Sequence, residues 1–200
     1  MKSYDLAYFD RWYRDPRHVE RQRAFLRRQV ALAVAMTEWV LERPIASVLD
    51  LGAGEGRWFR ELRRVRPRIR YQGVEPSDEA VRKHGRRRNL LRGDFDSLHR
   101  LGIGGPWDLV VAADVLHYLP TAAMRRAVHA MAPFVGGLAF CPTFTGADAI
   151  EGDREGFHRR RAATYRRAFA DAGLEQVAPW AWVPHGHAEE LADLERPGEG

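Results

Sequence analysis

The sequence predicts an α/β fold built around a parallel sheet. The first observation is a short apolar strand over residues 47–51, followed by three glycines at alternate positions and a helix-like run from Arg57. The second is that further apolar strands alternate with helical segments as far as residue 183. The third is a length of 200 residues, with 45% hydrophobic and 30% charged residues, which suits one soluble domain with a sizeable core.

The chain opens with a segment that is unusually rich in aromatic residues. Asp15-Pro16 then starts a helix that we expect to reach Glu42, because Pro44 stops it. The aromatic segment is either a lid over a ligand or part of a helix that packs by its rings, and the residues alone leave both interpretations open. The rings are Tyr4, Tyr8, Phe9, Trp12 and Tyr13.

Gly52, Gly54 and Gly56 follow the first strand. Glycines let the backbone turn tightly and leave no Cβ between the chain and a ligand. A strand, a glycine turn and a helix in this order direct backbone N–H groups and a helix N-terminus at a bound ligand. A dinucleotide fingerprint would need its third glycine at position 57, where this chain has Arg57. A plain tight turn is the structural alternative.

Acidic residues end the next two predicted strands. A helix over 57–65 leads to a strand over 69–75 that ends on Glu75, at about the separation at which an acid meets ribose hydroxyls. We expect Glu75 to be an exposed carboxylate with few structural contacts, able to accept from both hydroxyls. Pro76 then opens another helix. Residues 90–95 are expected to form a short third strand and its exit turn, which holds Asp94 and Phe95; an Asx-type turn is the structural alternative.

The fourth predicted strand, residues 107–113, is followed by Asp114-Val115-Leu116-His117-Tyr118. In open α/β sheets ligands bind outside the carboxyl ends of the strands. His117 is therefore a candidate general base, since an imidazole titrates at a pKa of about 6.5, and Tyr118 is a candidate to orient a substrate. The alternative is a histidine that packs at the start of a helix. A helix over 121–131 and a fifth strand over 136–141 come next.

The rest of the chain predicts a long loop, a helix and one more strand. Residues 142–156 are typical of a substrate or lid loop, and His158 just beyond them is a candidate to face the substrate. A helix over 157–172 precedes one final strand over 174–183, broken at Pro179. We treat residues 1–200 as a single domain with an N-terminal lid or helix region (1–43), a core (44–183) and a tail (184–200).

Charge and composition narrow the class of protein. The net charge of +5 raises the question of nucleic acid, but 27 acidic residues are interleaved with 32 basic ones. Clusters such as Arg159–Arg161 are therefore best interpreted as solvated faces. No apolar run approaches the ~20 residues of a membrane helix, and the first residues lack the apolar core of a signal peptide. With Cys141 as the only cysteine and no metal-ligand spacing, we expect a cytoplasmic enzyme without a metal.

Taken in order, these motifs resemble those of the class I S-adenosylmethionine (SAM)-dependent methyltransferases of the small-molecule type. Asp50 and the glycines resemble motif I, Asp94-Phe95 the third motif, and Asp108 with residues 114–119 motif IV. The resemblance implies a Rossmann-like, doubly wound, mostly parallel sheet of six or seven strands with helices on both faces. It also implies that SAM is the cofactor and S-adenosylhomocysteine the product.

The resemblance assigns roles to particular residues. It implies that Asp94 accepts from the adenine amine and that Phe95 packs on the adenine ring. Tyr4, Tyr8, Trp12, Tyr13 and His158 are then the expected lid or substrate residues. The cofactor-binding residues are expected to be Asp50, Gly52, Ala53, Gly54, Gly56, Glu75, Pro76, Asp94, Phe95, Ala113 and Asp114.

The expected reaction is transfer of a methyl group to an oxygen or nitrogen of a small molecule, as in a biosynthetic pathway. A base is needed only when the acceptor is a hydroxyl or a protonated amine, because the leaving thioether needs no proton. Two alternatives stay open: an RNA- or protein-directed methyltransferase that uses the arginine-rich faces, and a SAM-binding protein without transferase activity. Cys141 lacks the surrounding motif of a catalytic cysteine and is expected to be a small buried residue.

Overall fold

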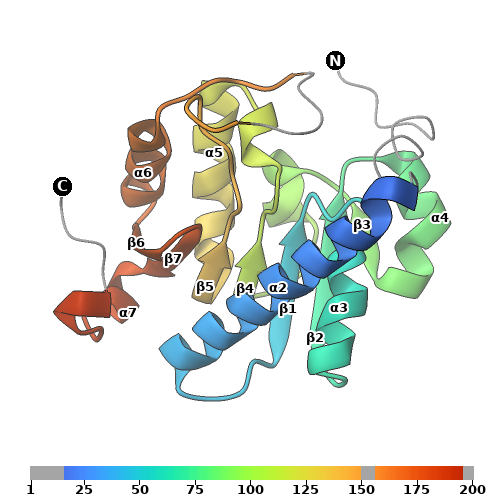
Figure 1. Ribbon diagram of the computed structural model, residues 1–200, viewed down its shortest axis with the longest axis horizontal. Helices are drawn as coiled ribbons and strands as arrows, with labels where there is room; N and C mark the ends of the chain where they lie inside the picture. The colour runs from blue at the N-terminus through green and yellow to red at the C-terminus, as the bar shows by residue number, and fades with distance from the viewer. Residues whose placement is uncertain (1–15, 150–155, 196–200) are drawn as a thin grey trace.

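The computed structural model describes residues 16–149 and 156–195, and its centre is a seven-stranded sheet (Figure 1). The strand order is β3-β2-β1-β4-β5-β7-β6; the first five neighbours run parallel, whereas β7 runs antiparallel to both β5 and β6. The predicted doubly wound, mostly parallel α/β sheet is confirmed. The strands are β1 (Ser47–Leu51), β2 (Arg70–Glu75), β3 (Leu90–Arg92), β4 (Trp107–Val111), β5 (Val135–Phe140), β6 (Leu174–Ala178) and β7 (Ala181–Pro184).

Helices cover both faces of this sheet. One hydrophobic cluster joins the sheet to the helices α2, α3 and α4, and the other joins it to α5, α6 and the first 3₁₀ helix (Figure 1). The α-helices are α2 (Pro16–Leu41), α3 (Arg57–Val65), α4 (Asp78–Arg88), α5 (Thr121–Met131), α6 (Ala162–Asp171) and α7 (His185–Ala188). The 3₁₀ helices are η1 (Phe95–Arg100), η2 (Leu116–Tyr118), η3 (Ala132–Phe134) and η4 (Asp193–Glu195). Among the described helices none is both long enough and apolar enough to cross a membrane.

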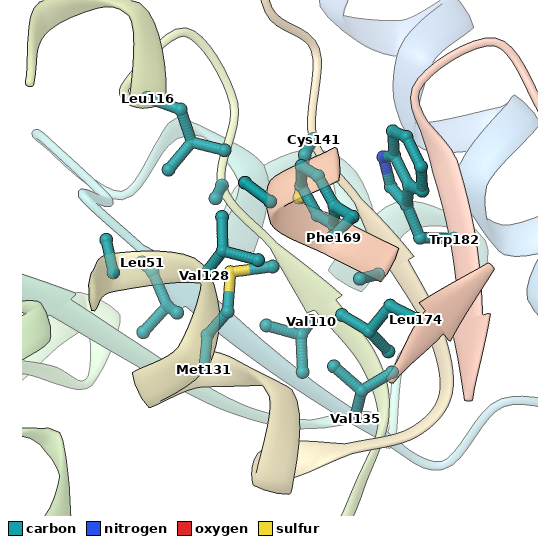
Figure 2. Close-up of a cluster of buried hydrophobic side chains, with 14 of the residues drawn as sticks. Leu51, Val110, Leu116, Val128, Met131, Val135, Cys141, Phe169, Leu174 and Trp182 are labelled. Atoms are coloured by element: carbon teal, nitrogen blue, oxygen red, sulfur yellow. The ribbon is translucent and has the colours of Figure 1, made fainter. Parts of the chain in front are cut away.

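Aromatic stacking consolidates the core under α5 and α6 (Figure 2). The ring of Phe169 on α6 stacks on Trp182 of β7, with the ring centroids 4.0 Å apart and the planes 6° from parallel. Cys141 belongs to the same cluster, and burial raises the pKa of its thiol well above the usual range. A thiol held in its neutral form is a poor nucleophile, so Cys141 is the small buried residue that the sequence predicts.

The end of the sheet differs from the prediction of one final strand over 174–183, which is wrong. Residues 174–184 instead form an antiparallel hairpin, in which Pro179 and Trp180 make the turn between β6 and β7. Proline has no N–H for the strand ladder, and Trp180 takes a left-handed conformation with a φ of 62°, which reverses the chain. The Trp180 carbonyl also accepts from the Cys141 N–H at 2.8 Å. The break at Pro179 therefore separates the sixth strand from the seventh.

Two helix starts also differ from the prediction. α4 begins after Ser77, whose hydroxyl accepts from the Ala80 N–H at 3.2 Å, so Pro76 stays outside the helix. The third strand ends at Arg92, and Asp94 caps η1. The helix that was expected from Phe157 begins at Ala162, because the preceding residues run along η2.

Asp108, at the start of β4, links the amino end of the sheet to the segment that follows α2. Its carboxylate accepts from the Ala46 N–H at 2.7 Å and pairs with Arg43 at 2.8 Å. Although burial opposes this, the hydrogen bonds from Arg43 and the backbone hold the pKa of Asp108 below its usual value. This acid of the fourth motif therefore has a structural role, far along β4 from the carboxyl edge.

Candidate functional site

The candidate site lies at the point where the strand order reverses. From β1 the chain proceeds to β2 and β3 on one side, and β4 and β5 lie on the other. In doubly wound sheets the crevice at such a switch point binds the ligand. The glycine turn follows β1 and the segment 114–118 follows β4, so the structure brings the predicted first and fourth motifs together. The contact is close, because a Cβ on Gly52 would lie 2.5 Å from Cγ2 of Val115.

All three glycines of the turn adopt left-handed backbone conformations. Their φ angles are 71° at Gly52, 55° at Gly54 and 69° at Gly56, values that side-chain-bearing residues adopt only with strain. The Gly52 and Ala53 N–H groups both donate to the Val74 carbonyl, at 2.8 and 3.2 Å. The turn is thus folded over the end of β2 before α3 begins at Arg57.

Glu75 is buried inside this turn, with only 4% of the residue exposed. Its carboxylate accepts from the Gly54 N–H at 2.7 Å and from the Ser77 N–H at 2.8 Å. Burial raises the pKa of this carboxyl, and the two backbone hydrogen bonds oppose the shift. The expectation of an exposed acid with few structural contacts is therefore wrong: Glu75 holds the glycine turn in place. Its role toward a ribose stays a prediction.

Asp50 lies beneath the turn in a buried pair that sequence analysis missed. The hydroxyl of Tyr71 on β2 donates to Asp50 Oδ2 at 2.6 Å, and Asp50 is 2% exposed. Burial, more than its proximity to Glu75, raises the pKa of Asp50 to about 7. The sequence signal was a tyrosine between Arg70 and Gln72 in the second predicted strand, since the hydroxyl of a tyrosine that is buried requires a partner. Tyr71 thus occupies one carboxylate oxygen of Asp50. The contact of Asp50 with a cofactor stays a prediction.

The Asp50 pair predicts a specific pH dependence of stability. The carboxyl ionises near 3.8 in an unfolded chain and near 7 in the folded protein, so between these values the folded state retains a proton that the unfolded state has lost. Asp50 therefore lowers the free energy of unfolding as the pH rises through this window, by a few kcal/mol, on the order of 1.4 kcal/mol per pKa unit. Asp50→Asn keeps an acceptor for Tyr71 and should gain stability relative to wild type as the pH increases.

Thermal unfolding of both proteins at pH 5 and pH 8 measures this effect. We expect Asp50→Asn to have the higher melting temperature relative to wild type at pH 8, with a smaller difference at pH 5. A difference that is the same at both pH values would show that Asp50 does not titrate in this range.

The predicted adenine contacts lie at the end of β3. Asp94 is exposed and caps η1 through a capping box, in which Oδ1 accepts from the Ser97 N–H at 3.0 Å. Phe95, the first residue of η1, is half-buried against the hydrophobic core. The Asx-type alternative thus describes the local structure, and the adenine roles of both residues stay predictions. Ala113 and Asp114 lie across the switch point, beyond the end of β4.

His117 lies in η2 at the centre of an aromatic cluster and is only 2% exposed. Its ring centroid is 4.3 Å from that of Tyr118 and 5.5 Å from those of Phe144 and Phe157. The Phe144 N–H lies 3.4 Å from Nδ1, so this nitrogen is an acceptor and the proton of a neutral ring belongs on Nε2. This arrangement gives His117 a structural place between η2 and the loop after β5; its action as a base stays a prediction.

A buried arginine holds that loop against η2. The Arg160 guanidinium donates to Thr121 Oγ1 at 3.0 Å, to the Leu116 carbonyl at 3.2 Å and to the Tyr165 hydroxyl at 2.9 Å, and it also bonds the Leu119 carbonyl. The interpretation of Arg159–Arg161 as a solvated face is therefore wrong for Arg160, which is buried. The sequence does not show this, because Arg160 reaches the Leu116 and Leu119 carbonyls only when the loop after β5 folds back against η2.

The remaining candidates fall outside the centre of the site or outside the described residues. His158 is exposed, and its backbone N–H donates to the His117 carbonyl at 2.9 Å. Tyr4, Tyr8, Phe9, Trp12 and Tyr13 lie outside the described residues, so the lid stays a prediction. Among the described residues no cluster of histidine, cysteine and carboxylate side chains could hold a metal ion. An apolar hollow of about 300 Å³ lies between α2, β6 and the segment after α7, and none of the site residues lines it.

Comparison with known proteins agrees with this arrangement. A family model described as a methyltransferase domain matches residues 17–179. No curated protein matches the sequence. Among solved structures, the chain is similar to the sugar N-methyltransferase KedS8 from Streptoalloteichus (20% identity, TM-score 0.60, covering 92% of this chain and 93% of that one).

Two further structures show the same fold. CalS10, an amino pentose methyltransferase from Micromonospora echinaspora, is 17% identical, with a TM-score of 0.63 and coverage of 91% of this chain and 97% of that one. An O-methyltransferase family protein from Burkholderia thailandensis is 21% identical, with a TM-score of 0.53; the match covers 83% of this chain but only 59% of the other.

The family match spans most of the chain, and the sheet topology, the glycine turn and the reversal of strand order between β1 and β4 all agree with it. The chain therefore belongs to the methyltransferase-domain family and has the fold of the class I SAM-dependent methyltransferases.

Proposed function

We propose that this protein transfers a methyl group from SAM to an oxygen or nitrogen atom of a small molecule. The observation that carries the proposal is the closed glycine turn: the Gly54 and Ser77 N–H groups fix Glu75 at the end of β2, and Gly52 packs against Val115 in the segment that follows β4. The solved relatives named for a sugar N-methyltransferase and an amino pentose methyltransferase support a small acceptor of this kind.

The order of the strands suggests how the cofactor is held. Asp94 and Phe95 at β3 suit the adenine, Glu75 at β2 suits the ribose hydroxyls, and the backbone of the glycine turn at β1 suits the amino-acid end. The bound cofactor supplies an activated methyl group on a sulfonium. The protein's contribution is then to hold the acceptor in line with that methyl group and to exclude water.

The acceptor site is proposed to lie beside η2. Tyr118, Phe144 and Phe157 are half-buried rings around His117, and they come from η2 and from the loop after β5. Arg160 ties that loop to η2 and so fixes the position of the rings. Half-buried rings of this kind offer an apolar wall for an organic acceptor, with the Tyr118 hydroxyl as a polar handle.

One observation favours a second candidate, an RNA-directed methyltransferase. Five exposed cations on α3, α4 and the connecting segment have no carboxylate partner among the residues that the structure describes: Arg63, Arg68, Lys83, Arg86 and Arg87. Such a surface can bind phosphates, and the binding would then weaken steeply with salt.

Methyl transfer from isotopically labelled SAM tests both candidates. The purified protein is incubated with small-molecule, RNA and protein fractions of a cell extract, and the label in each fraction is measured by mass spectrometry. We expect labelling of the small-molecule fraction. Labelling of RNA with a steep salt dependence would support the second candidate instead, and binding of SAM without any transfer would support a SAM-binding protein that is not a transferase.

A further inference from the structure

Asp114 stands out because its backbone is left-handed and because it is an exposed residue beside the glycine turn. Its φ is 57°, a left-handed value that strains a residue with a side chain, although aspartate tolerates it better than most. The Asp114 N–H donates to the Pro142 carbonyl at 2.9 Å, which holds this conformation between β4 and the loop after β5. Asp114 is exposed, whereas Ala112 and Leu116, two positions away in each direction, are fully buried.

The carboxylate of Asp114 has no partner in the described structure. No described side chain forms an ion pair with it, and no described N–H or O–H group donates to it. Although the residue is exposed, protein surrounds the carboxyl group closely enough for desolvation to raise its pKa to about 6. The carboxyl group is therefore mostly ionised at neutral pH, and no described cation compensates its charge. A positively charged ligand would stabilise it.

The position of Asp114 indicates which part of the cofactor it would meet. Val115, the next residue, packs directly against Gly52 of the glycine turn. Glu75, the proposed ribose residue, lies at the end of β2, on the other side of β1. With the ribose at β2, the rest of the cofactor would extend across the turn toward β4, where Asp114 is the acid beyond the strand end. The sulfonium and its methyl group would lie in this part of the site.

We propose that the Asp114 carboxylate faces the transferred methyl group and makes the site prefer the positively charged SAM to its neutral product. The inference rests on the proposed function. During transfer the carbon–sulfur bond would break with its electron pair left on sulfur, the acceptor's oxygen or nitrogen would form the new bond to carbon, and the acceptor's proton would pass to water. The positive charge on sulfur disappears in this step, so the attraction to Asp114 is lost and the product is released more readily than SAM.

Calorimetric binding of three ligands tests the inference without knowledge of the acceptor. The ligands are SAM, S-adenosylhomocysteine and sinefungin, an analogue with an aminomethine group in place of the methylsulfonium. Asp114→Asn keeps the shape and the tolerance of a positive φ but removes the charge. We expect it to weaken SAM and sinefungin by about tenfold, the scale of one partly desolvated charge contact, and to leave S-adenosylhomocysteine within about twofold.

Two further variants make the test specific. Asp114→Gly relieves the backbone strain and should show the same loss of preference in a protein at least as stable as wild type. Asp171→Asn, at an exposed acid on α6, removes the same charge away from the site and should leave all three affinities unchanged.

The outcomes separate this inference from the proposed function. Equal weakening of all three ligands in Asp114→Asn, or no change in any of them, would overturn the inference while leaving the cofactor site intact. If wild type binds neither SAM nor S-adenosylhomocysteine, the proposed function fails and this inference fails with it.

Discussion

Gly52→Ala is expected to abolish measurable binding of S-adenosylhomocysteine and to lower the melting temperature by several degrees. Two effects combine at this position. The φ of 71° costs an alanine about 1–2 kcal/mol, and its Cβ would lie 2.5 Å from Val115, so the glycine turn and the segment around Val115 must move apart. Because the cofactor is proposed to lie across this contact, the displacement removes the site itself. Thermal unfolding and calorimetry on the same preparation measure both quantities.

Gly102→Ala is the matched control for this variant. Gly102 has a similar φ of 62°, but a Cβ there would meet nothing within 4 Å. It should therefore show the backbone cost alone, a loss of about 1–2 kcal/mol or roughly 2–8 °C for a chain of this size, with unchanged affinity for S-adenosylhomocysteine. If the two variants bind the ligand equally well, the glycine turn is not part of the cofactor site.

Glu75→Ala should weaken the binding of both SAM and S-adenosylhomocysteine by about 10- to 150-fold. This range corresponds to the 1.5–3 kcal/mol of hydrogen bonds to a charged group. The variant should also lose stability, because the Gly54 and Ser77 N–H groups lose the acceptor that the buried carboxylate provides. Calorimetry well below the melting temperature separates the loss of binding from the loss of folding.

Glu79→Ala controls for removal of an acid from the same region. Glu79 lies on the first turn of α4 and pairs only with Arg82 among the described side chains, so its loss should change stability by less than about 1 kcal/mol. Its affinity for either ligand should match wild type. If folded Glu75→Ala binds S-adenosylhomocysteine as tightly as Glu79→Ala does, Glu75 is a structural residue and does not contact the ribose.

The parts of the fold that the sequence predicted are those that local patterns determine. An apolar run bounded by glycine or proline defines β1, and the helix limits at Arg57 and Thr121 follow from the residues next to them. Trp180 shows the limit of such reasoning. Nothing local marks a tryptophan for a left-handed turn, which forms because β7 must pair with β5 and return to β6.

The site was predictable in its segments but not in its contacts. The sequence placed the candidate residues after the ends of the predicted strands, because ligands bind outside the carboxyl ends of the strands in open α/β sheets. The burial of Glu75 depends on how the glycine turn closes around it, and the partner of Asp50 is a tyrosine on the neighbouring strand. The place of Arg160 likewise depends on a loop that returns from β5 to η2. Such tertiary contacts leave no periodic signal in the sequence.

Calorimetric titration of SAM and of S-adenosylhomocysteine into the purified wild-type protein tests the central claim most directly. The glycine turn, Glu75 and Asp94 offer contacts to the amino-acid end, the ribose and the adenine, so we expect one site with an affinity in the micromolar range, equivalent to about −8 kcal/mol. A thermal shift with each ligand should accompany the binding heat. A folded protein that shows neither heat nor a thermal shift with either ligand would contradict the account.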